Sequence, residues 1–120
     1  MHELSLMRNI LEIARRNIPA GAEHDVKEIH LRIGLAAGVV SDSLEFCFTV
    51  LTQDTPLENS KLVIEEVPLT IQCGECQSVG TREELYLICP VCGSNNVSIL
   101  SGMELEVSSI ELMELEKNIP

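Results

Sequence analysis

Four cysteines form two pairs, Cys73-Gly-Glu-Cys76 and Cys89-Pro-Val-Cys92, separated by residues 77–88. A tetrahedral Zn²⁺ needs four soft ligands, and each Cys-x-x-Cys turn supplies two thiolates from one tight loop. Pro90 presets the second turn, and Gly93 tolerates the positive φ that lets backbone amides point at the sulfurs. The spacing therefore predicts a zinc ribbon with a structural Cys₄ site.

The same cysteines could instead form two disulfides. No secretory leader precedes them, and the fifth cysteine, Cys47, has no partner, so we expect a reduced, cytoplasmic protein in which paired thiols hold metal. Cys47 stands between Phe46 and Phe48 in an apolar segment, where a cysteine acts as a small buried hydrophobic residue rather than as a nucleophile. The metal site is the better interpretation.

A second set of candidate ligands stands at the amino terminus, Met1-His2-Glu3. The bulky His2 disfavours removal of Met1, so the terminal amine, the imidazole and the backbone nitrogen between them lie within one chelate. Nitrogen-rich sets of this kind suit Ni²⁺ or Cu²⁺, whose d-electron count favours square-planar or tetragonal geometry. A histidine at position 2 is, however, far more often solvated in a frayed terminus. Spacing alone does not establish a site here.

Composition narrows the class of partner. The 120 residues carry a formal net charge of −11, and between residues 70 and 99 the basic side chains amount to Arg82 alone. Phosphate binding needs clustered Lys and Arg, and base stacking needs aromatic rings, of which this chain has one Tyr, two Phe and no Trp. We therefore expect no nucleic-acid partner, and, with no apolar run of about 18 residues, no membrane partner. An acidic surface suits a protein or a cation.

Helical and strand patterns alternate along the chain. A first helix is predicted to end at Pro19 and Gly21, because apolar residues recur at the spacing of one buried face: Leu4, Met7, Ile10, Leu11, Ala14 and Ile18. Residues 26–33 alternate between apolar and polar and predict a half-buried strand, with His30 on its polar face. A second helix is expected from about Ser41, with Ser41 or Asp42 as its cap and Glu45 completing a capping box.

A second strand is predicted over residues 61–67, with residues 69–71 following it, and one more strand over residues 105–112 returns after the cysteine pairs. The apolar alternation changes phase at residues 65–67 and again at Ser108-Ser109. Each slip predicts either a bulge or crossing, where the chain changes its surroundings, or a simple break in the strand. The sequence leaves both alternatives open.

This order of elements predicts an α+β fold, with two helices on one face of a three-stranded sheet and an inserted zinc-ribbon module. The main domain is expected to be discontinuous, residues 1–70 and 100–120, around a zinc-binding domain of residues 71–99. A module of about thirty residues buries too little apolar surface to fold alone, so Zn²⁺ must supply the missing stability.

Several segments together resemble the HypA/HybF family over essentially the whole chain: Met1-His-Glu-Leu-Ser-Leu6, Leu31-Arg-Ile-Gly34, Ser43-Leu-Glu-Phe-Cys-Phe48, the cysteine pairs, and Leu105-Glu-Val-Ser-Ser-Ile-Glu-Leu112. The resemblance implies a nickel metallochaperone for maturation of [NiFe]-hydrogenase, with transferable Ni²⁺ on Met1, His2 and Glu3 in the discontinuous domain, and structural Zn²⁺ on Cys73, Cys76, Cys89 and Cys92. It also implies two partners, a HypB-type GTPase and the hydrogenase large subunit; some relatives also serve urease.

The resulting function is a nickel carrier and not an enzyme. No Ser/His/Asp set or phosphate-binding loop can be assigned, and the three histidines are scattered at positions 2, 24 and 30. Asp42 is a candidate for an additional nickel ligand, although a helix cap is the better explanation of this residue. Two alternatives are a zinc-ribbon adaptor for protein interaction without transferable metal and a rubredoxin-like electron carrier.

Overall fold

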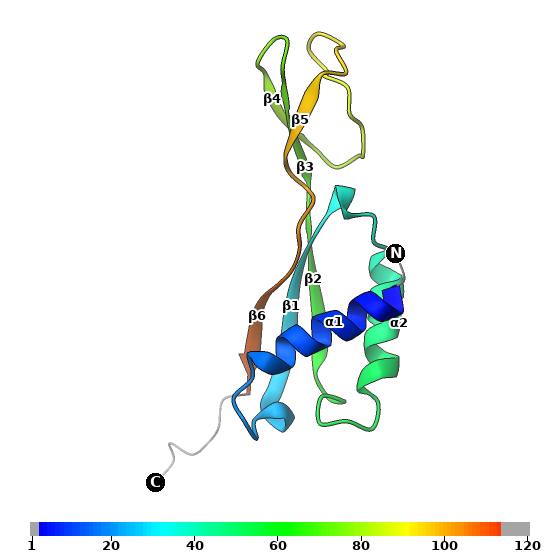
Figure 1. Ribbon diagram of the computed structural model, residues 1–120, viewed down its shortest axis with the longest axis vertical. Helices are drawn as coiled ribbons and strands as arrows, with labels where there is room; N and C mark the ends of the chain where they lie inside the picture. The colour runs from blue at the N-terminus through cyan, green and yellow to red at the C-terminus, as the bar shows by residue number, and fades with distance from the viewer. Residues whose placement is uncertain (1–2, 114–120) are drawn as a thin grey trace. The chain divides into compact units, whose positions relative to one another are not determined.

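The computed structural model describes residues 3–113, which form two α-helices, two short 3₁₀ turns and six β-strands. In chain order the elements are α1 (Glu3–Arg16), a 3₁₀ turn (Glu23–Asp25), β1 (Val26–Gly34), a 3₁₀ turn (Leu35–Ala37), α2 (Ser41–Thr52), β2 (Lys61–Val67), β3 (Leu69–Cys73), β4 (Val79–Arg82), β5 (Val97–Ser101) and β6 (Leu105–Leu112). The strands form two sheets, with the orders β2-β1-β6 and β4-β3-β5 (Figure 1). The α+β class is confirmed.

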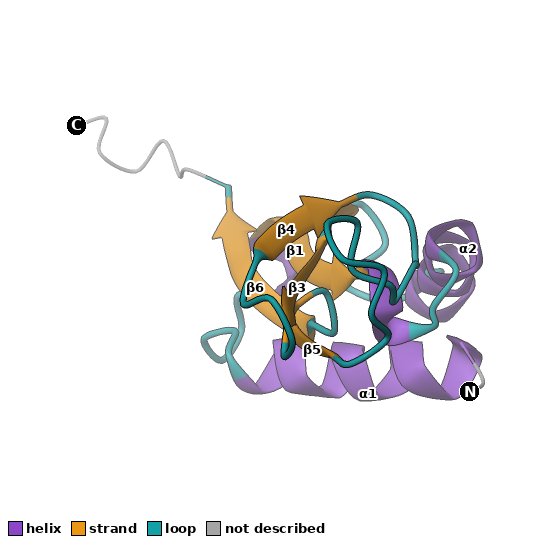
Figure 2. Ribbon diagram, turned by 90° about the horizontal axis from the view of Figure 1, so that it is seen from above, coloured by secondary structure: helices purple, strands orange, loops and turns teal. Residues whose placement is uncertain are grey.

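The described residues divide into two compact units. Unit 1 comprises residues 3–31, 39–64 and 107–113, and unit 2 comprises residues 32–38 and 65–106. Both α-helices, drawn in purple in Figure 2, belong to unit 1, whereas unit 2 contains strands, loops and one 3₁₀ turn. The two units thus have different kinds of core.

The core of unit 1 is apolar and follows the predicted spacing. In α1 the residues Met7, Ile10, Leu11 and Ala14 are buried, and α1 packs against α2. Along β1 the side chains of Ile29 and Leu31 are buried, while Glu28 and His30 remain half-buried on the other face. Both the amphipathic helix and the half-buried strand are confirmed.

The predicted cap of α2 is wrong. Val40 is the residue before the first helical turn, and no side chain caps the helix there. Ser41 and Asp42 are instead the first and second helical residues, so neither holds the cap position, and Glu45 cannot complete a capping box. Asp42 still contributes, because a carboxylate in the first turn interacts favourably with the helix dipole.

The two predicted phase slips have different outcomes. β2 ends at Val67 and β3 begins at Leu69 in the other sheet, so the chain passes between sheets at Pro68, which has no backbone N–H for a ladder bond. The crossing between sheets that the phase change at residues 65–67 predicted is therefore present, directly after Val67. In contrast, β6 runs through Ser108 and Ser109 as one continuous strand.

Within unit 2, β3 is the central strand and pairs antiparallel with both β4 and β5. Beside it, Gly34 and Gly102 make a backbone contact that leaves no room for a side chain. A Cβ on Gly34 would lie 2.0 Å from the carbonyl carbon of Gly102. The backbone N–H groups of Gly34 and Ala36 donate to the carbonyls of Glu104 and Gly102, at 2.7 and 2.6 Å.

Replacement of Gly34 by Ala should therefore destabilise the protein by about 3 kcal/mol, because the clash is with backbone that cannot rotate away. Gly80→Ala is the matched control in β4, since nothing lies within 4 Å of its added Cβ. That control should change the free energy of unfolding by no more than about 0.5 kcal/mol. Denaturant unfolding measures both variants, and equal stability of the two would contradict the backbone contact.

Candidate metal centres

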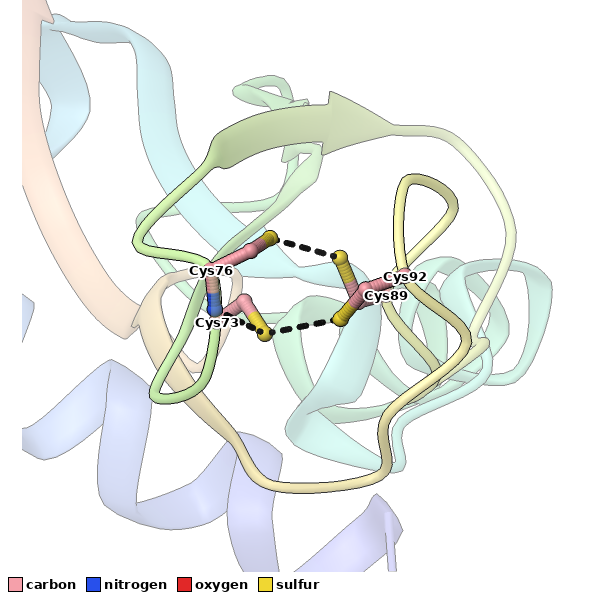
Figure 3. Close-up of side chains that lie close together, drawn as sticks. All are labelled: Cys73, Cys76, Cys89 and Cys92. Atoms are coloured by element: carbon pink, nitrogen blue, oxygen red, sulfur yellow. Dashed lines mark hydrogen bonds between the residues drawn. The ribbon is translucent and has the colours of Figure 1, made fainter.

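The two cysteine pairs converge on one point in unit 2 (Figure 3). The Sγ atoms of Cys73 and Cys92 lie 3.5 Å apart, those of Cys76 and Cys89 lie 3.6 Å apart, and all four lie within 4.8 Å of one another. A Zn–S bond of about 2.3 Å in a tetrahedron places sulfurs about 3.8 Å apart. All five cysteines of the chain are described, and all are free thiols. The predicted ligand set is thus brought together, and its geometry fits a four-coordinate ion such as Zn²⁺.

The two turns that carry the cysteines have the same backbone design. In the first, residues 73–78, the amide of Cys73 donates to the carbonyl of Ser78 at 2.9 Å, and the amide of Gln77 donates to that of Cys73 at 3.1 Å. In the second, residues 89–94, the corresponding bonds each measure 2.8 Å. The fifth residue has a positive φ in both turns, 67° at Gln77 and 77° at Gly93. The predicted role of Gly93 is confirmed.

These turns aim backbone amides at the sulfurs. The amides of Glu75 and Cys76 donate to Cys73 Sγ at 3.3 and 3.4 Å, and the amide of Val91 donates to Cys89 Sγ at 3.4 Å. Hydrogen bonds to a charged group favour its ionised form. The cage is therefore built for thiolates, the form that binds metal.

Ser78 adds a hydroxyl between the two pairs. Its Oγ lies 3.0 Å from Cys76 Sγ and 3.4 Å from Cys89 Sγ, so its single proton can serve one sulfur at a time. This hydroxyl is the largest cause that lowers the pKa of Cys76, and, ahead of the backbone amides of Cys92 and Val91, it lowers the pKa of Cys89 to about 6. The hydroxyl thus favours the thiolate form of both sulfurs.

The pKa of Cys92 shifts in the opposite direction. The backbone amide of Ser94 favours its thiolate, but the adjacent sulfur of Cys73, burial, and the sulfurs of Cys89 and Cys76 outweigh it and raise the pKa of Cys92 to about 12. Without a cation the four sulfurs cannot all ionise at neutral pH. A bound divalent ion reverses this, because its charge stabilises every coordinating thiolate.

Asn96 forms hydrogen bonds with the first cysteine turn, although it lies far from that turn in the sequence. Its carbonyl accepts from the amide of Gly74 at 2.8 Å, and its Nδ2 donates to a carboxylate oxygen of Glu75 at 3.0 Å. Neither Ser78 nor Asn96 was predicted from the sequence. A serine two residues after the first cysteine pair is a recognisable signal for Ser78, whereas no local pattern links Asn96 to Glu75, which lies 21 residues earlier.

The amino-terminal candidates are described only in part. Met1 and His2 lie outside the described residues, and Glu3 is the first residue of α1. Glu3 lines an open surface hollow of unit 1 together with Asp42 and Cys47. The two acidic candidates therefore share one hollow, and Cys47 is half-buried at its side.

A four-cysteine cage of this geometry in a small α+β chain defines a metal-binding protein with a zinc-ribbon type of module. Residues 1–112 match the family described as HypA, hydrogenase/urease nickel incorporation, metallochaperone. The chain belongs to this HypA family, as the resemblance in its sequence indicated. Within residues 3–113, no helix has the length and apolar content required to cross a lipid bilayer.

Individual relatives agree with this placement. A protein named hydrogenase maturation factor HypA from Desulfosudis oleivorans is 44% identical over 115 residues, which cover 95% of this chain and 100% of that protein. A protein of the same name from Desulfatibacillum aliphaticivorans is 41% identical over 118 residues, 98% of this chain and 91% of that one. The solution structure of the Ni metallochaperone HypA from Helicobacter pylori shares the fold with a TM-score of 0.64 and 22% identity, covering 94% of this chain and 98% of that chain.

Replacement of Cys73 by Ala should remove bound Zn²⁺ and unfold the module around the cage, because the free energy of metal binding is also folding free energy. Cys47→Ala is the matched control, since Cys47 is outside the cage. Metal analysis should find one Zn²⁺ per chain in the control and much less in Cys73→Ala. Full zinc content in both variants would remove the Cys₄ assignment.

Replacement of Ser78 by Ala should make the cage release Zn²⁺ at higher pH during acidification. The hydroxyl lowers the pKa of Cys76 and Cys89, so without it protons compete earlier with the metal as the pH falls. Because water compensates for part of the lost hydrogen bond, the midpoint should rise by about half a pH unit. A chromogenic chelator measures the midpoint, and Ser98→Ala, an exposed position on β5, is the control. Identical midpoints for the two variants would contradict the role of Ser78.

Proposed function

We propose that this protein is a nickel metallochaperone that binds Ni²⁺ at its amino terminus and releases it for maturation of [NiFe]-hydrogenase. The ligands are the Met1 amine, the His2 imidazole and the backbone nitrogens up to Glu3. The observation that carries the proposal is the family match, which begins at Met1 and includes the Met-His-Glu segment. The hollow that Glu3 shares with Asp42 supports it, because Asp42 can add a carboxylate oxygen to a nickel ion held there.

A terminal site suits a carrier, which must release its metal as well as bind it. A short chelate at the end of a chain can give up its ligands one at a time while those of a recipient enter. By contrast, a cage of four thiolates leaves no coordination position open, as in structural zinc sites. We therefore assign transferable Ni²⁺ to Met1, His2 and Glu3 and structural Zn²⁺ to the four cysteines.

The partners in this proposal are proteins. A HypB-type GTPase and the hydrogenase large subunit are the expected ones, with urease maturation as a further use of the same cargo. The net charge of −11 suits a cation as cargo and suits basic protein surfaces better than nucleic acid. No catalytic activity is part of the proposal. The predicted domains, residues 1–70 with 100–120 for nickel and residues 71–99 for zinc, stay a prediction.

The test is a nickel titration of the zinc-loaded protein with its native amino terminus. Two residues added before Met1 should abolish the site, because the terminal amine becomes an amide without basicity. His2→Ala should have the same effect, and His24→Ala, an exposed loop position, should bind like the native protein. Nickel should be released as the pH falls from about 8 to about 6, since the free amine titrates at about 7.7–8.0 and the imidazole at about 6.5.

The same titration distinguishes the nickel carrier from the zinc-ribbon adaptor. Equal nickel affinity in the native, extended and His2→Ala proteins would show that the amino terminus is not a metal site. The zinc-ribbon adaptor would then become the better function. The electron-carrier alternative is separated by colour, because Fe³⁺ bound by thiolates is red and Zn²⁺ is colourless.

A further inference from the structure

Apart from the cysteine cage, one other group of potential ligands lies close together among the described residues: Glu28, His30 and Glu111. One donor atom from each residue lies within 4.8 Å of the other two. A ring nitrogen of His30, Nε2, lies 2.9 Å from Oε1 of Glu28. All three residues belong to unit 1, and none belongs to the cysteine cage or to the amino-terminal segment.

Two neighbouring strands bring these residues together. Glu28 and His30 are two positions apart on β1, so their side chains project from the same face, and Glu111 lies on the adjacent strand β6. The Ser108 hydroxyl donates to the carbonyl of His30 at 3.2 Å, and the amide of Met113 donates to that of Asp25 at 2.6 Å. The strands thus run antiparallel past this point. The site is supported by a sheet rather than by a loop.

The charges in this group are not balanced by protein partners. The side chain of Glu111 forms no hydrogen bond or ion pair with any residue in the described range, although its carboxylate lies within 4.8 Å of that of Glu28. Glu28 interacts with His30, whose imidazole carries charge only when protonated. Two carboxylates at this separation repel each other unless a proton or a cation lies between them. His30 is partly shielded, with 33% of its side chain exposed, so the ring is held in place while remaining accessible to an ion.

We propose that Glu28, His30 and Glu111 form a second, open site for a divalent transition ion of the Zn²⁺ and Ni²⁺ type. An imidazole suits these ions, and the two carboxylates balance the double positive charge of the ion, so that the complex is neutral. Water fills the remaining coordination positions, so the site exchanges its ion faster than the thiolate cage. Mg²⁺ is disfavoured, because it prefers oxygen ligands and keeps its hydration shell. The site shares no ligand with the proposed nickel terminus, so the two proposals stand or fall separately.

The direct test uses two histidines, His24 and His30, as reporters. In the full-length His2→Ala protein, with the cysteine cage already loaded with Zn²⁺, the imidazoles of His24 and His30 are followed by NMR during addition of further Zn²⁺ and, separately, Ni²⁺. The His30 ring signals should shift saturably with Zn²⁺ and broaden with Ni²⁺. Signals of His24, which is exposed in the loop before β1, should not respond, and excess Mg²⁺ should not reverse the effect.

Matched variants test whether all three ligands take part. Glu28→Gln and Glu111→Gln should each weaken Zn²⁺ binding at His30 by about tenfold or more. Glu84→Gln, an exposed position in unit 2, makes the same change of net charge and should leave the affinity unchanged. Amide spectra of β1 and β6 verify that the sheet is intact. The proposal is overturned if His30 in the unmodified sheet does not respond to either ion, or if Glu111→Gln binds as tightly as Glu84→Gln.

Discussion

Four sulfur atoms within 4.8 Å of one another are stable as thiolates only around a cation, and the fold of unit 2 depends on that requirement. Its buried apolar side chains are few, Ile33, Val67, Leu69 and Ile71, joined by the cysteines Cys73 and Cys89. The loop that joins the two turns exposes Leu85, Tyr86, Leu87 and Ile88 to solvent. The burial of so few side chains does not offset the conformational entropy of the 49 ordered residues of unit 2. An ion bound by the four cysteines would therefore be part of the core of unit 2, and the hydrogen bonds to sulfur fix the positions of its ligands.

The sequence predicted those parts of the structure that follow from local periodicity or from ligand spacing. The buried face of α1, the alternation in β1 and the convergence of the four cysteines all follow from residues that are close in the chain or repeat regularly. The positive φ at Gly93 was predictable because glycine adopts it without strain. The passage of the chain between sheets at Pro68 was also predictable, because the apolar alternation of the strand changes phase just before it.

Two kinds of feature could not be predicted from the sequence. Some depend on the pairing of strands that are distant in the chain, and others on which of several neighbouring residues takes the helix cap position. Asn96 reaches the first cysteine turn only because β3 and β5 are paired, and Glu111 meets Glu28 only because β1 and β6 are adjacent. The prediction of the α2 cap was wrong for a local reason. Ser41, Asp42 and Glu45 match the capping pattern in composition, but the helix begins one residue early, so Val40 takes the cap position.

The two cysteine turns, so alike in hydrogen bonding, are unequal in backbone strain. The second turn has glycine at its left-handed position, whereas the first holds Gln77 there at φ 67°, a conformation that costs a non-glycine residue about 1 kcal/mol. The second turn also contains Cys89, whose pKa of about 6 makes it a thiolate at neutral pH before any metal arrives. The same turn also carries Cys92, whose pKa is raised to about 12, whereas Cys76 in the first turn has a lowered pKa. Each turn therefore contributes one sulfur that ionises readily, and the backbone strain at Gln77 is the difference that remains between the two turns.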